Sequence, residues 1–330
     1  MRIAALPICA SLLLSLTGAA APPQAPAHIA ATTLRADDLR VATVAYRIGL
    51  TARTFCPQPY PLTGLLLHHL PEYDAQGRSM EIARYGLDRG PGVLATVEDS
   101  PAARAGLEAG DVLLDVDGKT FPDPKAMAAE PDRKLWRRTV EASEAQIEDA
   151  LRQGPARLRV LRAGQERLVT LDSIPGCPIR IRLARSKQVN AFADGRYVTL
   201  TSAILAFVRN DDELAVVIGH ELAHNVLGHK ERLEAEDVPE GLLGKIGKNA
   251  ARIRTTEEEA DRFGLKLAWA AGYDVTAAMP YWQRFYAAYG GGLQIFRTHP
   301  GLRAREQLVE QAIAELSRER RPAAQGDQSR

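Results

Sequence analysis

The chain has 330 residues, of which 45% are hydrophobic and 25% are charged, and its formal net charge is +1. These values are typical of a globular protein that is large enough for a real core and for two domains. Because no long basic block is present to neutralise a phosphate backbone, we expect no nucleic-acid partner.

Residues 1–20 have the pattern of a secretory signal peptide: one basic residue, Arg2, precedes a long uncharged run that ends in small residues. Cleavage is expected after Ala20, and the length of the run leaves an uncleaved anchor as the alternative. We expect no transmembrane span once the signal is removed. The protein is therefore predicted to be exported, to the periplasm or another part of the cell envelope.

Two cysteines, Cys56 and Cys177, remain after the signal. An even count in an oxidising compartment favours a disulfide between them, and two unrelated buried thiols are the alternative. A disulfide would tie the start of the chain to the segment that follows residue 175. Whatever lies between the two cysteines would then be an insertion.

The pattern of apolar residues and glycines changes near residue 84. Residues 21–83 are predicted to be an N-terminal helical segment, in which residues 36–53 carry apolar side chains at helical spacing. Residues 84–173 consist instead of short β-like runs and glycine turns, and the last two runs alternate around Ala163 and Gly164 as a hairpin does. A separate β-rich domain is expected there.

The stretch DSPAARAGLEAGDVLLDVDGK, residues 99–119, resembles a PDZ domain in its short helix start and its AGL, AGD and DG turns. The resemblance implies that an extended peptide binds as an added strand between Val93–Val97 and a helix at about Glu141–Arg152. Pro91, in the loop before that strand, lacks the N–H that would hold a peptide carboxylate. A scaffolding or gating role is therefore the alternative to peptide binding.

Residues 174–318 are predicted to form an α+β domain. A hairpin signal around Asp194 and Gly195 is followed by helical patterns to about Arg318. The last residues, 319–330, are polar and are expected to be disordered.

The stretch HELAH carries the chemistry of this domain. His220 and His224 are four residues apart on a predicted helix, so both rings leave one face and can bind one metal ion. Glu221 is placed to take a proton from water that the metal activates. The helix is expected to begin at Asp211, after a capping box formed by Asn210 and Glu213. A histidine-rich surface helix without a metal is the alternative.

A third histidine, His229, follows closely. In one large class of zinc peptidases the third ligand lies six residues after the second, and here that residue is Lys230. On a continuous helix His229 lies about half a turn round from His220. We therefore interpret His229 as a structural or surface residue.

The third ligand is expected to be an acid on another helix, at residues 255–272. The apolar face of that helix, extended backward, reaches Glu257 and takes in Asp261, whereas Glu258 and Glu259 point elsewhere. Acids on an apolar face are costly unless a charged group satisfies them. The spacing thus favours Glu257 as a metal ligand and Asp261 as the residue that orients a ligand histidine.

HELAH and EEEAD together resemble family 48 of the metallopeptidases, which includes HtpX and the CAAX prenyl proteases. The resemblance covers residues 188 to about 310 and implies zinc as the cofactor, a zincin-like fold with an edge hairpin plus helices, Glu257 as third ligand and Asp261 beside a ligand histidine. Unlike those relatives, the chain has no comparable apolar span after the signal.

Two further motifs carry the resemblance. NAFADG resembles the family's edge strand beside the zinc, which implies that Asn190, Ala191 and Phe192 bind substrate in extended form. THPGLRAR resembles its HP-x4-R motif, which implies that His299 lies near the metal and that Arg305 makes a structural or oxyanion-side contact.

We therefore predict a zinc endopeptidase with a PDZ-like domain inserted before the catalytic domain. His220, His224 and Glu257 would bind one zinc ion, Glu221 would act as general base, and His299 would stabilise the oxyanion or occupy the open zinc position. The resemblance makes unfolded or misassembled envelope proteins the expected substrates, as in protein quality control. The rival is a latent or chaperone-like binding protein whose zinc is structural.

Overall fold

The computed structural model describes residues 27–56, 58–238, 248–289 and 301–319. The expected signal peptide, His299 and all but the first residue of the expected tail lie outside the described residues.

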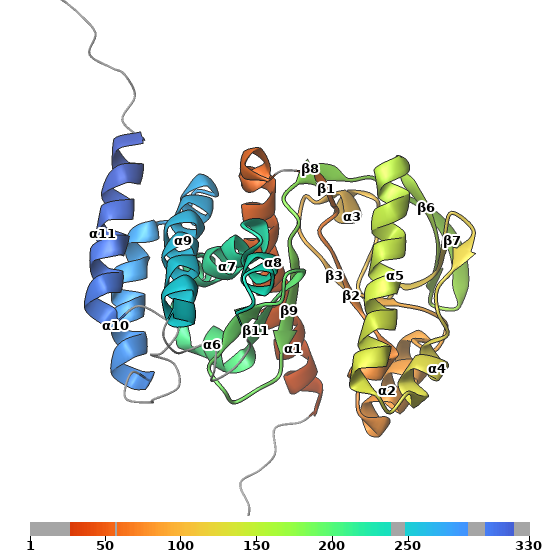
Figure 1. Ribbon diagram of the computed structural model, residues 1–330. Coiled ribbons are helices and arrows are strands. Elements are labelled where there is room, and N and C mark those ends of the chain that lie inside the picture. The colour runs from red at the N-terminus through yellow and green to blue at the C-terminus, as the bar shows by residue number, and fades with distance from the viewer. Residues whose placement is uncertain (1–26, 57, 239–247, 290–300, 320–330) are drawn as a thin grey trace, which may run out of the picture.

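Helix α1, Ala27–Thr51, lies between the two parts of the molecule, a β-rich part and a mainly helical part (Figure 1). Its apolar residues form two faces. Ile48 is fully buried in the core of the helical part, whereas Ala42 and Tyr46 pack against the β-rich part. The apolar spacing that predicts this helix therefore serves two cores at once.

The β-rich part is built on a six-stranded sheet in the order β2-β3-β4-β6-β7, with β5 paired to β4. Its elements are β1 (Tyr60–Leu62), β2 (Leu65–His68), α2 (Ala75–Tyr85), β3 (Gly92–Thr96), α3 (Pro101–Arg104), β4 (Val112–Val116), β5 (Lys119–Thr120), α4 (Pro124–Ala129), α5 (Arg133–Gln153), β6 (Ala156–Arg162), β7 (Gln165–Leu171) and β8 (Ile174–Gly176). The hairpin between β6 and β7 turns at Ala163 and Gly164, whose φ angles are 49° and 77°. Positive φ at both central residues is what the tightest hairpin turns require.

Two details of this part differ from the prediction. The sheet begins at β2, well before residue 84, so the β-rich part takes in residues that the sequence assigns to the helical segment. Strand β3, expected to line the peptide groove, is paired on both sides, by β2 and by β4. A paired strand cannot accept another strand, so the edge available beside helix α5 is β2, preceded by Thr63 and Gly64 rather than by Pro91.

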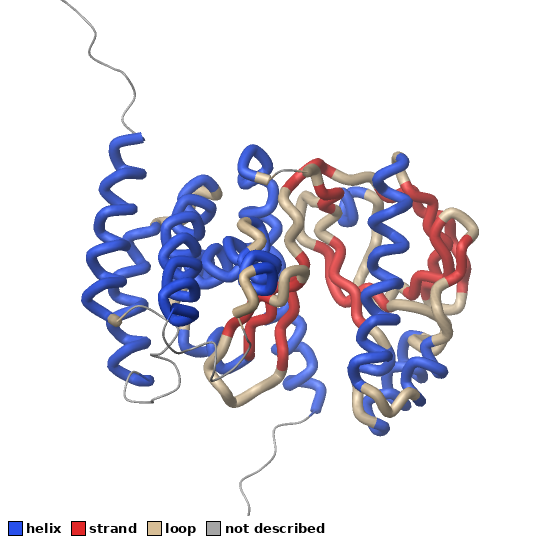
Figure 2. Tube along the Cα trace, viewed as in Figure 1, coloured by secondary structure: helices blue, strands red, loops and turns tan. Residues whose placement is uncertain are grey.

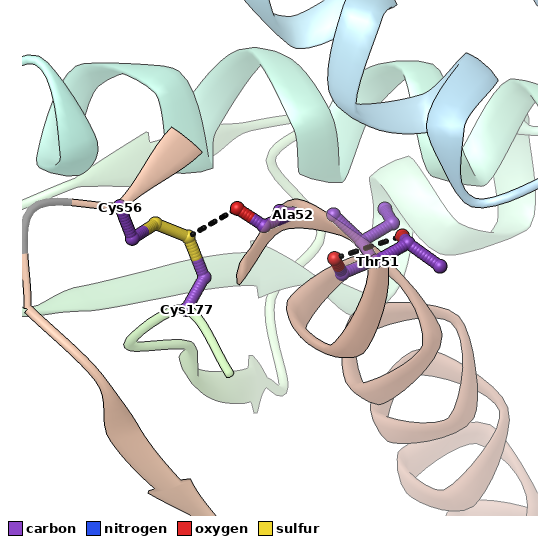
Figure 3. The surroundings of a disulfide bond; sticks show 5 residues. Thr51, Ala52, Cys56 and Cys177 are labelled. Carbon is purple, nitrogen blue, oxygen red and sulfur yellow. Dashed lines mark hydrogen bonds between the residues drawn. A yellow bond between two sulfur atoms is a disulfide. The ribbon is translucent and has the colours of Figure 1, made fainter. Parts of the chain in front are cut away.

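A disulfide between Cys56 and Cys177, whose Cα atoms are 5.5 Å apart, links the two chain segments that lead into and out of the β-rich part (Figure 3). The antiparallel pair of β1 and β8 joins the same two chain segments, next to the disulfide. The sulfur of Cys177 lies 3.5 Å from the carbonyl oxygen of Ala52. Since a sulfur in a disulfide carries no proton, this is a close contact rather than a donated hydrogen bond. The expected disulfide is present, and the β-rich part is an insertion between its two ends.

The helical part packs against a three-stranded sheet of order β10-β11-β9. Its elements are β9 (Arg180–Ala184), β10 (Ala191–Ala193), β11 (Tyr197–Thr201), α6 (Ser202–Phe207), α7 (Asp211–Val226), α8 (His229–Ala235), α9 (Lys248–Ala270), α10 (Ala278–Tyr289) and α11 (Leu302–Glu319). Short 3-10 turns occur at Ala52–Phe55, Leu70–Glu72 and Val275–Ala277. Figure 2 shows that its strands lie on the side that faces the β-rich part. This is the mixed α+β architecture that the sequence predicts.

Ion pairs connect the two parts across this boundary. Glu144 and Glu148 lie on one face of α5, and they meet Arg180 and Arg182 of β9. Arg180 donates to Glu148 with an Nε–Oε1 distance of 2.6 Å, and the Tyr197 hydroxyl donates to Glu144. Burial works to raise the pKa of Glu148, but the hydrogen bonds from Arg180 outweigh it and lower this pKa. The carboxylate is therefore charged, and α5 is fixed to the sheet that carries β10.

Candidate metal centre

Helix α7 begins where the sequence predicts. The Asn210 side chain accepts a hydrogen bond from the backbone N–H of Glu213 at 2.9 Å. The expected return bond goes to a different partner, because the Glu213 carboxylate accepts from the N–H of Arg209 and from Arg284. The cap still fixes the start of α7, and so the direction in which its histidines leave the helix.

Helices α7 and α9 touch at two glycines. A Cβ at Gly264 would lie 2.6 Å from the backbone nitrogen of His220, and one at Gly219 would lie 2.5 Å from the carbonyl oxygen of Gly264. Only glycine allows the two backbones to approach this closely. The contact sits directly before His220, and it brings the histidines of α7 against the acids of α9.

The structure places His220, His224 and Glu257 together. The His220 Nε2 atom lies 3.3 Å from His224 Nε2 and 3.4 Å from Glu257 Oε2, and His224 Nε2 lies 3.6 Å from Glu257 Oε1. Tetrahedral zinc, with bonds of about 2.0–2.2 Å, needs ligand atoms separated by roughly 3.3–3.6 Å. These three side chains are also the group within the described residues whose ligand atoms could hold one metal ion. The donor set therefore fits zinc in kind and in spacing.

His220 is fixed by a buried charged chain. Its Nδ1 atom lies 2.9 Å from Asp261 Oδ1, and the other oxygen of Asp261 accepts from Arg305 Nε at 2.6 Å. The Arg305 guanidinium also lies over the ring of Trp282, 3.9 Å from its centre. With Nδ1 of His220 donating to Asp261, its Nε2 atom faces Glu257 and is the ring nitrogen that would bind a metal ion.

The charge balance of this site favours a cation. Burial would lower the pKa of His220, but its hydrogen bonds to Asp261 and Glu257 outweigh burial and raise this pKa to about 10. Burial would likewise raise the pKa of Asp261, but Arg305 and His220 hold it below its usual value. Two buried carboxylates thus hold a positive charge at His220, which a proton supplies when a metal ion does not.

His224 has a partner that the sequence does not predict. Helix α7 ends at Val226, and Gly228, with φ of 61°, reverses the chain before α8 begins at His229. His229 is 1% exposed, and its Nδ1 lies 2.9 Å from Nδ1 of His224. Its other ring nitrogen lies 3.0 Å from Glu259 Oε2, which also accepts from Arg232 at 2.7 Å. His229 is therefore not a surface residue, and as a structural residue it contacts a candidate ligand directly.

Strand β10 lies beside these residues at the free edge of its sheet. A cavity of about 100 Å³ is lined by Asn190, Ala191, His220 and Glu221 among others, so the candidate base and the expected substrate strand share one space. The turn that follows β10 is tied to α7, because the N–H of Gly195 donates to the Asn225 side chain at 2.8 Å.

Phe192, the next residue of β10, is 42% exposed and lines a different cavity. That cavity, of about 1050 Å³, lies between β2 and α5 of the β-rich part and α1 and β9 of the helical part. It is far larger than the space beside His220, but it holds none of the candidate ligands. The small cavity, lined by His220 and Glu221, is therefore the candidate site, and β10 borders both cavities.

Comparison with known families agrees with this geometry. The sequence profile described as peptidase family M48 matches residues 155–238 and 248–313. The catalytic domain belongs to peptidase family M48. A second profile, described as a PDZ domain, matches residues 92–129, within the β-rich part. The chain thus combines an M48 metallopeptidase domain with a PDZ domain.

Several M48-type relatives are similar over part of their length. The chain is 28% identical over 196 residues to a putative beta-barrel assembly-enhancing protease of Vibrio cholerae, over 46% of this chain and 40% of that protein. It is 27% identical to the mitochondrial metalloendopeptidase OMA1 of Schizosaccharomyces pombe, over 46% of this chain and 51% of the relative. It is 26% identical to metalloprotease YcaL of Escherichia coli, over 43% and 65%. The chain thus spans less than two thirds of each of these relatives.

Among the residues that the structure describes, no helix combines the length and the apolar composition that crossing a membrane requires.

Proposed function

We propose that this chain is a zinc-dependent endopeptidase that hydrolyses proteins of the cell envelope. The observation that carries the proposal is the convergence of His220 Nε2, His224 Nε2 and the Glu257 carboxylate at zinc-ligand spacing. Glu221 lines the same small cavity as His220, so a base lies beside a candidate ligand. A purely structural zinc site has no need of such a base.

His220, His224 and Glu257 would hold the zinc ion, and Asp261 with Arg305 would orient His220. When bound, zinc supplies a Lewis acid that polarises the scissile carbonyl and lowers the pKa of water toward about 7. Glu221 takes the proton of the attacking water and passes it to the leaving amine. His299 remains a candidate for stabilising the oxyanion, on the strength of its motif alone.

Strand β10 is proposed to bind the substrate. It pairs with β11 on one side, and within the described chain no strand pairs with its other edge. An extended peptide can add there through main-chain hydrogen bonds, which suit many sequences because they involve no side chain. Ala191 faces the cavity that contains Glu221, so a peptide on β10 would run past the base.

The class of substrate is inferred from the relatives. Their names include a beta-barrel assembly-enhancing protease and metalloproteases of bacteria and mitochondria. Together with the signal pattern of residues 1–20, this supports export to the periplasm or envelope and a role in removing unfolded or misassembled proteins there. A disulfide between Cys56 and Cys177 is also stable in the oxidising compartments that exported proteins reach.

The PDZ domain is proposed to bind a peptide along β2. This strand is the sheet edge that faces α5, and Leu65, Leu67 and Ile147 line the cavity between them. The same cavity reaches Phe192 of the substrate strand. A polypeptide held by the PDZ domain would therefore lie next to the strand that presents substrates.

Cleavage of an unfolded protein such as casein tests the proposal. The mature chain, from residue 21, should cleave casein, lose this activity with a zinc chelator and regain it when zinc is restored. A chain that binds one zinc ion and retains casein without cleaving it would contradict the proposal and favour the chaperone-like rival.

A further inference from the structure

His224 and His229 face each other at the end of α7, and their contact determines where the protons lie. The ring centres are 4.9 Å apart with the planes inclined at 80°, and the Nδ1–Nδ1 distance of 2.9 Å is that of a hydrogen bond. One of these two nitrogens must donate and the other must accept.

Glu259 decides which nitrogen donates. A carboxylate only accepts, so the His229 Nε2 atom, 3.0 Å from Glu259, must carry its proton. Arg232 reaches the same carboxylate oxygen at 2.7 Å and favours its ionised form. A neutral His229 then has a lone pair on Nδ1, which accepts the Nδ1 proton of His224. The Nε2 atom of His224 is left with a lone pair, directed toward His220 and Glu257.

The opposite arrangement is disfavoured at Glu259 and would leave His224 unable to bind a metal ion. If His229 carried its proton on Nδ1, its Nε2 lone pair would face the Glu259 carboxylate. His224 would then be protonated on Nε2, where no lone pair would remain for a metal. With both rings neutral, the contact with Glu259 therefore favours one assignment of protons, and that assignment leaves His224 Nε2 able to bind a metal ion.

We propose that His229 and Glu259 are positioning residues that fix the tautomer and ring orientation of His224. This inference rests on the proposed zinc site and deepens it. Asp261 orients His220 directly. His224 is oriented by the ring of His229, which is itself held by the Glu259 carboxylate, and we call this chain of contacts the relay. The two ligand histidines thus have separate supports, one buried at Arg305 and one that ends at the half-exposed Arg232.

Three variants of the mature chain test the relay. His229→Leu removes the acceptor, His229→Gln restores an acceptor for His224 and a donor for Glu259, and Glu258→Gln changes an exposed neighbour of Glu259. Zinc affinity is measured by competition with a chromophoric chelator. Loss of an outer partner weakens metal binding by about 10- to 100-fold, which we expect for His229→Leu, while His229→Gln recovers most of it and Glu258→Gln matches the wild type.

The tautomer of His224 is the second readout, and it needs no metal. Long-range proton–nitrogen NMR spectra of the metal-free chain should show His224 protonated on Nδ1 in the wild type and shifted toward Nε2 in His229→Leu. Wild-type zinc affinity in His229→Leu, or equal losses in both His229 variants with an unchanged tautomer, would overturn the relay. A wild type that binds no zinc would overturn the proposed function instead, while the tautomer still decides the relay.

Discussion

Replacing Gly264 by alanine should damage the metal centre without touching a ligand. The new Cβ would lie 2.6 Å from the His220 backbone nitrogen and 2.7 Å from the Gly219 carbonyl carbon, about 0.8 Å inside the 3.4 Å at which ordinary contact begins. Because these atoms belong to the backbone of α7, no side chain can rotate away. Helices α7 and α9 must move apart by a comparable distance.

A zinc site tolerates about 0.2 Å in each ligand distance, so this movement separates Glu257 from the histidines by more than zinc allows. Overpacking of this kind costs about 1–3 kcal/mol. Since zinc binding must draw the helices back together, the same cost should appear as about 5- to 150-fold weaker zinc affinity. Thermal unfolding and chelator competition measure the two effects, with Gly301→Ala as control because a Cβ there meets open space. Wild-type Tm and wild-type zinc affinity in Gly264→Ala would refute the reasoning.

Three further predictions follow from other parts of the structure. Glu257→Gln should abolish stoichiometric zinc binding at neutral pH, whereas Glu258→Gln should leave it intact, and equal zinc contents by mass spectrometry would argue against Glu257 as a ligand. Reduction of the disulfide between Cys56 and Cys177, which closes a loop with a sequence separation of 121, should lower the free energy of unfolding by about 5 kcal/mol in denaturant titrations; equal midpoints with and without reductant would contradict this. Burial lowers the pKa of His69 to about 3, so the unfolded chain takes up a proton below pH 6.5 that the folded chain does not, and the contribution of His69 to stability falls with falling pH, by about 2 kcal/mol at pH 5. His69→Leu should lose this part of the pH dependence, and an unchanged difference between pH 7 and pH 5 would show that another group causes it.

Local spacing predicts the parts of the site that belong to a single helix. His220 and His224 share a face because they are four residues apart, and Glu257 and Asp261 follow the apolar stripe of α9 for the same reason. The close contact between α7 and α9 was not predictable in this way, because Gly219 and Gly264, which make it, lie far apart in the sequence. An isolated glycine in a helical pattern indicates close packing only once its partner is known.

The misplaced features share one cause, which is that the spacing within one segment does not show where that segment ends or what folds back against it. His229 falls half a turn away from His220 only if α7 continues, and the left-handed Gly228 ends it. Glu259 points away from Glu257 along α9, yet α8 folds back to meet it. Strand β2 is a short apolar run whose neighbours carry no strand signal, so the edge of the PDZ sheet became clear only from the strand order.

The most direct test of the account measures zinc content and casein cleavage on the same preparations of wild type and Glu221→Gln. We predict one zinc ion per chain in both proteins, because Glu221 is not a ligand, and a cleavage rate lower by about 10²- to 10⁴-fold in the variant, because the base is lost. A variant that keeps its zinc and cleaves casein at the wild-type rate would contradict the assignment of this site as the peptidase centre.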